Sequence, residues 1–532
     1  MKIAFVTPEL DPLVRITQLA ELSRALPRAL HEAGHDARIF LPLSRPVTEL
    51  QLVNLERVSS VRVRDGIGPE VFVIWRLEGH DAPVYLFENP NHFSDRNPYG
   101  SAEGPYPDNW RRYGLFARAV LASLAPLDFE PEVLHCMDWT TGLVPVLQDF
   151  EYARKHPDHP AAKAGTYFQI HNLAIQGAFE REILPKLGLP HRIFQDVGGV
   201  NLAGKVNFLK AGCEFATVLG THSPGHAQRI QEQDRGYGLE EVFRRRAKEL
   251  VGITNGIDYL AWDPESDPAL PKTFSIKDKN LAGKRRCKAV LQQELGLDNG
   301  PRTPLAAVIG RFDSDSGFDL VAEVLTSILE HNFEVVLMGA GRADILDRIK
   351  TMETTFTGRC KVLEGYNLDL AHRIMGGSDL LLLPSHYHPG NALCAIGMRY
   401  GVVPVVYSAS GLEDFVADLG TAGRTGTGLR FDPYNGDGLI EAIERARKLY
   451  RNAANWKAIQ LRCMRQDFSW AATAAEYVKA YRRVTRRSKT PPPEPKPIRL
   501  AKPAPARERK KTTAKSAGKT GKATKRSRKA SA

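Results

Sequence analysis

The chain has 532 residues, enough for two or three domains, and 42% of them are hydrophobic, enough for large cores. Its formal net charge of +12 is not spread evenly: residues 488–532 hold 15 Lys and Arg against 2 Asp and Glu, a net of +13. The rest therefore carries 58 basic and 59 acidic residues, a net of −1, which excludes a folded body that is basic throughout.

Cysteine usage and hydropathy exclude several further classes. The six cysteines are scattered without any C-x-x-C pair, so we expect reduced thiols rather than a zinc site or a disulfide framework. The apolar start of the chain is too short for a signal peptide, and no run approaches the roughly 18 apolar residues of a membrane span. We therefore expect a cytoplasmic protein with no membrane partner.

The N-terminal residues predict a βαβ unit. Residues 3–6 form an apolar run typical of a short buried strand, and residues 19–31 carry leucines at helical spacing before Gly34. Residues 37–43 are predicted to form the next strand. This order favours a doubly wound α/β sheet, whose ligands bind at the C-terminal ends of the strands.

Polar residues follow two further predicted strands of this half. Asp138 and Trp139 come directly after the strand 133–137, and His171 lies within the stretch FQIHNLAIQGAF, residues 168–179. A carboxylate beside an aromatic ring is a common sugar-binding pair, since one binds hydroxyls and the other the apolar face of the ring. Each of these residues alone is more often structural, so both interpretations stay open from the residues alone.

The C-terminal half repeats the pattern of strand, loop and helix. Strands are predicted at 304–309, with Arg311 in the following loop, and at 335–341. The stretch DLLLLPSHYHPGNALCAIGMRYG, residues 379–401, predicts a buried strand at 380–383, a polar loop, and a helix over 392–400; a further strand follows at 402–406. The first N–H groups of that helix would form an anion site.

Several blocks of this sequence resemble one family. FQIHNLAIQGAF, GITNGID (252–258), HRIMGGSD (372–379) and QDFSW (466–470) are similar to blocks of bacterial glycogen synthases and plant starch synthases, retaining glucosyltransferases that use ADP-glucose or UDP-glucose. The resemblance covers about residues 1–485. It implies an α/β fold of two Rossmann-like doubly wound domains facing a cleft, the GT-B type.

The resemblance also implies a domain organisation. We expect an N-terminal acceptor domain over residues 1–258 and a nucleotide-sugar donor domain over 259–465. A closing helix within 466–487 would cross back to the N-terminal domain. Residues 488–532 are rich in Pro and Lys without apolar periodicity, which is typical of a disordered tail.

The family's catalytic positions fall on five residues here. By resemblance, Asp138 and His171 orient the transferred sugar, and Arg311 holds the diphosphate. His388 stands where the family has a glutamate, and Ser316 stands where it has a lysine. Because a well-placed cation stabilises the charge of a leaving diphosphate by several kcal/mol, these two substitutions bear directly on activity.

Five more positions are assigned to the donor by resemblance. Arg15 takes the place of the lysine in the first loop, Asn255 faces the cleft, and Tyr366 stacks on the nucleotide base. Asn391 and Ala392 begin the helix that faces the sugar nucleotide. In the same first loop the family has two glycines where this chain has side chains, so a close diphosphate contact and a plain strand-to-helix connection are both open there.

Two functions follow from the resemblance. The first is an enzyme that moves glucose from ADP-glucose (or UDP-glucose) to the non-reducing end of an α-1,4-glucan with retention, with no cofactor and no metal. The alternative is a catalytically impaired relative that binds glucan or nucleotide and acts in regulation, as the residues at 316 and 388 suggest. The basic tail 488–532 predicts non-specific binding to polyanions such as DNA, RNA or polyphosphate, although a solvated tail without a dedicated partner is also compatible with its sequence.

Overall fold

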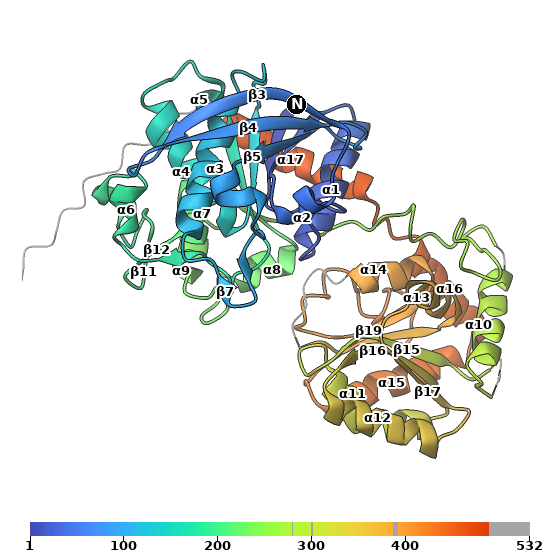
Figure 1. The fold of residues 1–532 in the computed structure, drawn as a ribbon. Helices are drawn as coiled ribbons and strands as arrows, with labels where there is room; N and C mark the ends of the chain where they lie inside the picture. The colour runs from blue at the N-terminus through green and yellow to red at the C-terminus, as the bar shows by residue number, and fades with distance from the viewer. Residues whose placement is uncertain (279, 299, 301, 387–391, 489–532) are drawn as a thin grey trace, which may run out of the picture. The chain divides into compact units, whose positions relative to one another are not determined.

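The computed structural model describes residues 1–278, 280–298, 300, 302–386 and 392–488. His388, Asn391 and the predicted tail from residue 489 onward lie outside the described residues. The described chain builds two separate doubly wound sheets, which confirms the predicted α/β fold class (Figure 1).

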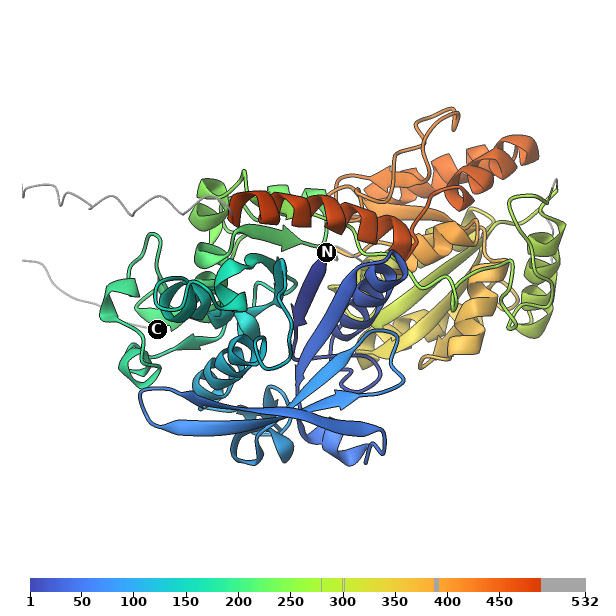
Figure 2. The same ribbon diagram turned by 90° about the horizontal axis from the view of Figure 1, so that it is seen from above.

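The N-terminal lobe is built on a nine-stranded sheet in the order β14-β13-β9-β8-β1-β2-β5-β4-β3. Its strands are β1 (Lys2–Val6), β2 (Asp36–Pro42), β3 (Leu55–Arg64), β4 (Pro69–Leu77), β5 (Val84–Glu88), β8 (Val133–Met137), β9 (Gly165–Ile170), β13 (Val218–Thr221) and β14 (Leu250–Gly252). All neighbours pair in parallel except β3 with β4 and β4 with β5, which form an antiparallel ribbon at one edge (Figure 2). Small two- and three-residue strands complete the lobe: β6 (Gly100–Ser101), β7 (Gly104–Pro105), β10 (Ala178–Phe179), β11 (Asn201–Leu202) and β12 (Lys205–Asn207).

The chain order of this sheet reverses between β1 and β8. From β1 the chain passes to its neighbour β2 and then to the edge strand β3, from which β4 and β5 lead back to β2. It continues on the other side of β1 with β8, where Ile3 pairs with Val133. Such a switch point leaves a crevice beyond the C-terminal ends of the two strands. Residues 3–6 are fully buried because helices cover both faces, which explains their continuous apolar run.

Helices cover this sheet, and the last helix of the described chain is one of them. The principal helices of the lobe are α1 (Leu19–Glu32), α3 (Asn109–Ser123), α4 (Leu143–Leu147), α7 (Phe208–Phe215), α8 (Pro224–Arg229), α9 (Glu240–Arg245) and α17 (Trp470–Ser488), with the short helices α2 (Arg45–Glu49), α5 (Pro160–Lys163) and α6 (Ile183–Lys186). Helix α17, dark red in Figure 2, packs beside α1 and over β9. Its Tyr481 hydroxyl lies 2.6 Å from Nδ1 of the buried His135 on β8, so the C-terminal helix belongs to the core of the N-terminal lobe.

The C-terminal lobe is built on a six-stranded parallel sheet in the order β17-β16-β15-β18-β19-β20. Its strands are β15 (Leu305–Phe312), β16 (Glu334–Gly341), β17 (Cys360–Glu364), β18 (Leu380–Leu383), β19 (Val403–Tyr407) and β20 (Leu429–Phe431), and its helices are α10 (Ala282–Glu294), α11 (Phe318–Glu330), α12 (Ala343–Thr355), α13 (Leu368–Gly377), α14 (Ala392–Arg399), α15 (Gly436–Tyr450) and α16 (Ala453–Met464). Figure 1 shows α11, α12 and α15 on one face and α13, α14 and α16 on the other. The switch point lies between β15 and β18.

The strands and the helix predicted in the C-terminal half are confirmed, with one difference. Arg311 was expected in the loop after a strand ending at residue 309, but β15 continues to Phe312. The reason is its long neighbour β16, which keeps pairing as far as Phe312 with Gly341. Arg311 is therefore the second-last residue of a strand. Among the described helices none is long and apolar enough to cross a membrane.

Candidate active site

A cavity of about 1110 Å³ opens at the C-terminal ends of β1, β8, β9 and β13, at the switch point of the N-terminal sheet. All residues that line it belong to the N-terminal lobe. They come from the loops at 16–19, 97–105, 138–140 and 171–175, together with Pro46, His222, His226, Arg235, Tyr237 and Asn255. Three residues predicted from the sequence, Asp138, His171 and Asn255, therefore share one cavity.

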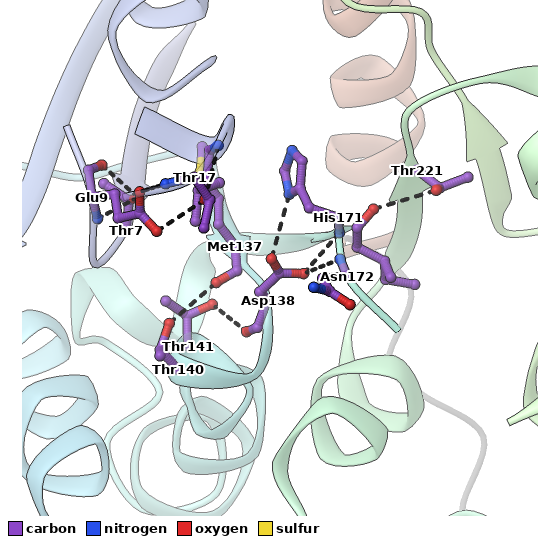
Figure 3. A network of polar contacts seen from close by, with 12 residues as sticks. Thr7, Glu9, Thr17, Met137, Asp138, Thr140, Thr141, His171, Asn172 and Thr221 are labelled. Atoms are coloured by element: carbon purple, nitrogen blue, oxygen red, sulfur yellow. Dashed lines mark hydrogen bonds and ion pairs between the residues drawn. The ribbon is translucent and has the colours of Figure 1, made fainter. Parts of the chain in front are cut away.

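Asp138 stands at the end of β8 with an unusual backbone, φ 55° and ψ −172°, a conformation that costs energy for any residue other than glycine. Its Oδ1 accepts hydrogen bonds from the backbone N–H groups of His171 (2.7 Å) and Asn172 (3.4 Å), so the carboxylate joins β8 to the loop after β9 (Figure 3). Burial raises the pKa of Asp138 to about 7, against the opposing effect of these two amides. The group can thus change its protonation state near neutral pH.

The His171 ring lies beside Asp138, with Nδ1 3.8 Å from Oδ2 of Asp138 (Figure 3). Burial lowers the pKa of His171 to about 3, so its imidazole is neutral at physiological pH. Both ring nitrogens are buried and have no hydrogen-bond partner among the described residues. A neutral imidazole with two unused polar atoms in a cavity is suited to bind a sugar hydroxyl.

Aromatic rings form one wall of the cavity. The Trp139 ring is nearly buried and packs against Tyr99 and Tyr113, with ring centroids 6.4 and 5.2 Å away. Gly177, at φ +61°, allows this packing, because a Cβ there would lie 2.4 Å from the Trp139 ring. Tyr237 at the rim is 60% exposed. Aromatic faces together with the amides of Asn172 and Asn255 match the alternation of apolar and polar surface on a sugar.

The first loop is held by the protein itself. The backbone N–H groups of Ile16 and Thr17 donate to the buried carboxylate of Glu9, at 3.0 and 2.7 Å. Gln18 has φ −63°, so the loop does not adopt the backbone that would require a glycine there. Arg15 does not line the cavity: its side chain is 78% exposed and lies 3.7 Å from Asp11.

Sequence analysis missed four residues of this region: Glu9, Tyr99, His222 and His226. Glu9 accepts a hydrogen bond from the Tyr99 hydroxyl, although the two residues are 90 positions apart. The His222 and His226 rings stack with centroids 4.1 Å apart at the end of β13. The usable signal was a polar residue soon after an apolar strand, which applies to Glu9 and to His222; nothing in the sequence pairs Tyr99 with Glu9.

The predicted residues of the C-terminal lobe gather at the ends of β15, β17 and β18. Arg311 is 75% exposed and forms an ion pair with Asp313, with 3.1 Å between the charged groups. The N–H of Ser316 donates to the same carboxylate at 2.8 Å, and the Ser385 hydroxyl lies 3.5 Å from the carbonyl of Ser316. Asp313 therefore organises the loop and at the same time neutralises Arg311.

The remaining donor-side positions are only partly described. Tyr366 follows β17 and is 61% exposed, and Ala392 is the first residue of α14. His388 and Asn391 lie outside the described residues. Among the described residues no group of three His, Cys, Asp or Glu side chains is arranged to hold a metal ion.

Comparisons with known proteins decide the family. Residues 2–245 match the model of the starch synthase catalytic domain, and residues 293–460 match that of glycosyl transferases group 1. The chain is 38% identical to glycogen synthase 2 of Geobacter sulfurreducens, over 91% of this chain and 98% of that protein. It is 36% identical to the glycogen synthase of Syntrophotalea carbinolica, over 91% and 99%. The chain belongs to the glycogen synthase family.

Solved structures agree with the membership in the glycogen synthase family. The catalytic domain of starch synthase IV from Arabidopsis thaliana, bound to ADP and acarbose, is similar with a TM-score of 0.76 and 28% identity, over 91% of this chain and 99% of that chain. A sucrose-phosphate synthase from Thermosynechococcus elongatus shares the fold at a TM-score of 0.54 and 16% identity, over 91% and 98%. The resemblance expected from the motifs is thereby confirmed.

The polar groups of the two lobes are arranged differently in this chain. In the C-terminal lobe Arg311 is paired with Asp313, and in the N-terminal lobe the exposed Arg15 lies beside Asp11. Asp138 and His171, in contrast, lie together, and the Asp138 carboxylate accepts the His171 N–H.

Proposed function

We propose that this protein is a retaining glucosyltransferase that moves glucose from ADP-glucose to the 4-hydroxyl at the non-reducing end of an α-1,4-glucan. The observation that carries the proposal is the cavity in which Asp138 and the neutral His171 meet, in a chain matched over 91% of its length to glycogen synthases. A related structure was solved with ADP and acarbose, a nucleotide and an oligosaccharide analogue, which supports a nucleotide-sugar donor and a glucan acceptor.

In this reaction the bond between the glucose C1 and the diphosphate breaks, and C1 bonds to the acceptor oxygen on the same face. The acceptor proton leaves with the departing diphosphate or to solvent. Asp138 and His171 would orient the glucosyl unit, Arg311 would hold the diphosphate, and Tyr366 would stack on the base. Asn255 and Arg15 would complete the donor contacts, with Ala392 placing the start of α14.

The decisive experiment is transfer of labelled glucose from ADP-glucose to glycogen by the full chain, with UDP-glucose as a second donor. We expect transfer with ADP-glucose that is lost in Asp138→Ala. Activity equal to a blank without enzyme, for both donors, would reject the proposal. We further propose that transfer needs no metal or other cofactor, so an excess of EDTA should leave the rate unchanged.

A catalytically impaired relative that binds glucan or nucleotide is the second candidate. The pairing of Arg311 with Asp313 and the serine at 316 favour it. The similarity to full-length glycogen synthases favours the enzyme. The double variant Ser316→Lys, His388→Glu separates the two candidates. If the wild-type chain is inactive and the double variant transfers glucose, the protein is the impaired relative.

For the basic tail we propose non-specific binding to polyanions, supported by its net charge of +13 over residues 488–532. Binding by counterion release falls steeply with salt concentration. The full chain should be retained on double-stranded DNA at low salt and released at high salt, whereas a chain ending at Ser488 should not be retained. Equal retention of the two chains would contradict the proposal. The cytoplasm remains the proposed location.

A further inference from the structure

A buried carboxylate lies beside the candidate active site without being part of its lining. Glu9 follows β1 by three residues and has no solvent-exposed surface. Its Oε2 accepts the N–H groups of Ile16 (3.0 Å) and Thr17 (2.7 Å), and its Oε1 accepts the hydroxyls of Thr17 (2.9 Å) and Tyr99. Among the described residues no basic side chain forms an ion pair with it, so hydrogen bonds alone hold this carboxyl group. Figure 3 shows Glu9 beside Thr7 and Thr17.

The four hydrogen bonds join two segments that both line the cavity. Thr17 belongs to the loop at 16–19 and Tyr99 to the loop at 97–105, which come from distant parts of the sequence. Without Glu9, the Tyr99 and Thr17 hydroxyls and two backbone N–H groups would each lose their acceptor. Because a buried donor without an acceptor costs about 1–3 kcal/mol, these segments would rearrange rather than stay in place.

The Tyr99 segment is fixed from its other side. The fully buried Arg112 on α3 donates to the carbonyl oxygens of His92 (2.7 Å), Asn97 (2.9 Å) and Pro98 (2.9 Å). The side-chain amide of Asn109, also on α3, donates to the carbonyl of Tyr99 at 2.8 Å. The loop at 97–105 is thus anchored to α3, and Glu9 is the point at which this anchored loop is joined to the first loop.

Glu9 also acts electrostatically on Asp138. Burial is the main reason that the pKa of Asp138 is raised, and the negative charge of Glu9 adds to it. The other titratable groups close to Asp138 are His171, Tyr99 and Cys213. Removal of the charge on Glu9 would therefore lower the pKa of Asp138 without touching Asp138 itself.

We propose that Glu9 is a positioning residue for glucosyl transfer. Its carboxylate holds the loops at 16–19 and 97–105 in the arrangement in which the sugar binds between Thr17, Tyr99 and Asp138. Glu9 itself does not contact the sugar. This inference rests on the proposed function, because it names what prepares that site for its sugar.

Two substitutions separate the geometry from the charge. In Glu9→Gln the amide oxygen can accept the two backbone N–H groups, while the amide N–H₂ donates to the hydroxyls of Thr17 and Tyr99, which can both accept. This variant keeps the arrangement and removes the charge. Glu9→Ala removes both. Glu103→Gln is the matched control, since Glu103 lies in the same 97–105 loop, is exposed and does not line the cavity.

The experiment measures binding of maltoheptaose by calorimetry and glucose transfer from ADP-glucose as a function of pH, for the full chain and the three variants. We expect Glu9→Ala to lose about a hundredfold in kcat/KM, the size of effect that follows a 1 Å displacement of an active-site group, and to bind maltoheptaose more weakly. The kcat/KM of Glu9→Gln at its optimum pH should stay within about threefold of the wild-type value. In its pH–rate profile, the limb that reports the titration of Asp138 should move to lower pH. Glu103→Gln should match wild type in both.

Four results would overturn the proposal. One is a soluble, folded Glu9→Ala with wild-type transfer and wild-type maltoheptaose binding. Two more apply even if Glu9→Ala does not fold: a Glu9→Gln variant with an unmoved pH limb, and a Tyr99→Phe variant with unchanged maltoheptaose binding. The fourth is a wild-type chain that neither binds maltoheptaose nor transfers glucose. If the wild-type chain binds maltoheptaose but transfers no glucose, the proposed function is rejected. The role of Glu9 is then tested by maltoheptaose binding to the Glu9 variants alone.

Discussion

The N-terminal cavity and the C-terminal loops carry polar groups that are arranged differently. In the cavity, Asp138 is held by two backbone N–H groups, and the neutral His171 keeps both ring nitrogens for a ligand. At the end of β15, Arg311 is exposed and its charge is matched by Asp313. The comparison teaches that the cavity keeps buried polar atoms available for a ligand, whereas the charge of Arg311 at the end of β15 is matched by a carboxylate.

The difference follows from the physical demands of each side. A sugar hydroxyl is bound by single, well-placed hydrogen bonds in a preformed cavity, which a rigid sheet supplies. A diphosphate carries several negative charges, so its binding depends on the net charge nearby, and Asp313 and Asp315 oppose the charge of Arg311. We therefore expect sugar-side substitutions to destroy function and donor-side substitutions to improve it.

The largest effect is expected from the sugar side. Asp138→Asn keeps the acceptor for the His171 N–H but removes the charge, and asparagine tolerates the unusual backbone at this position better than most residues. We expect a loss of about 10²–10³-fold in kcat for glucose transfer, the typical cost of one electrostatic group at a reacting centre. Asp158→Asn, an exposed carboxylate in the same lobe, should leave the rate unchanged. A rate within threefold of wild type for Asp138→Asn would show that the cavity is not the sugar site.

A smaller gain is expected from the donor side. Ser316→Lys returns a cation to the loop that Asp313 organises. We expect ADP to bind about tenfold more tightly by calorimetry at low salt, since one added charge near a surface diphosphate is worth about 1–2 kcal/mol. Ser314→Lys is the matched control, because it adds the same charge two residues away at an exposed position. Equal gains in both variants would mean that only net charge matters, which would contradict a defined donor site at 316.

Stability should reveal the protonation of Asp138. The pKa of Asp138 is raised to about 7 in the folded protein, far above its ordinary value, so the folded state holds a proton that the unfolded state has lost between about pH 4 and pH 7. The free energy of unfolding therefore falls as pH rises through this window. We expect Asp138→Asn to be more stable than wild type by about 1–3 kcal/mol at pH 8 and nearly equal to it at pH 4, in urea titrations. An equal difference at both pH values would contradict the raised pKa.

The smallest effect is expected where Arg311 is released from its partner. Asp313→Asn removes the charge that neutralises Arg311 but keeps an oxygen that can accept the Ser316 N–H. We expect about threefold tighter ADP binding, since an exposed ion pair of this kind is worth less than 1 kcal/mol. The measurement is an ADP isotherm, and the gain should disappear in Arg311→Ala, Asp313→Asn. A gain that persists without Arg311 would show that the arginine does not contact the nucleotide.

Much of the fold was predictable because local patterns determined it. The apolar runs at 3–6 and 380–383 became β1 and β18, and the polar residues after β8 and β9 met at one edge of the sheet as parallel strands require. The family and its two sheets followed from motif blocks that carry those strand ends.

The contacts that were not predictable depend on how the loops and strands fold in three dimensions. Nothing near Glu9 in sequence indicates that Tyr99 will donate to it, and Arg15 offered no sign that it would lie beside Asp11 outside the cavity. The pairing of Arg311 with Asp313 depends on the length of β15. Pairing with the neighbouring strand β16 extends β15 beyond the apolar run from which it was predicted. Roles at His388 and Asn391 stay predictions.

The measurement that tests the account most directly is the incorporation of labelled glucose from ADP-glucose into glycogen by the full chain, followed by analysis of the configuration of the new bond. The account predicts time-dependent incorporation through α-1,4 bonds, lost in Asp138→Asn and kept in Asp158→Asn. Incorporation no greater than in the absence of protein, with ADP-glucose and with UDP-glucose alike, would contradict it.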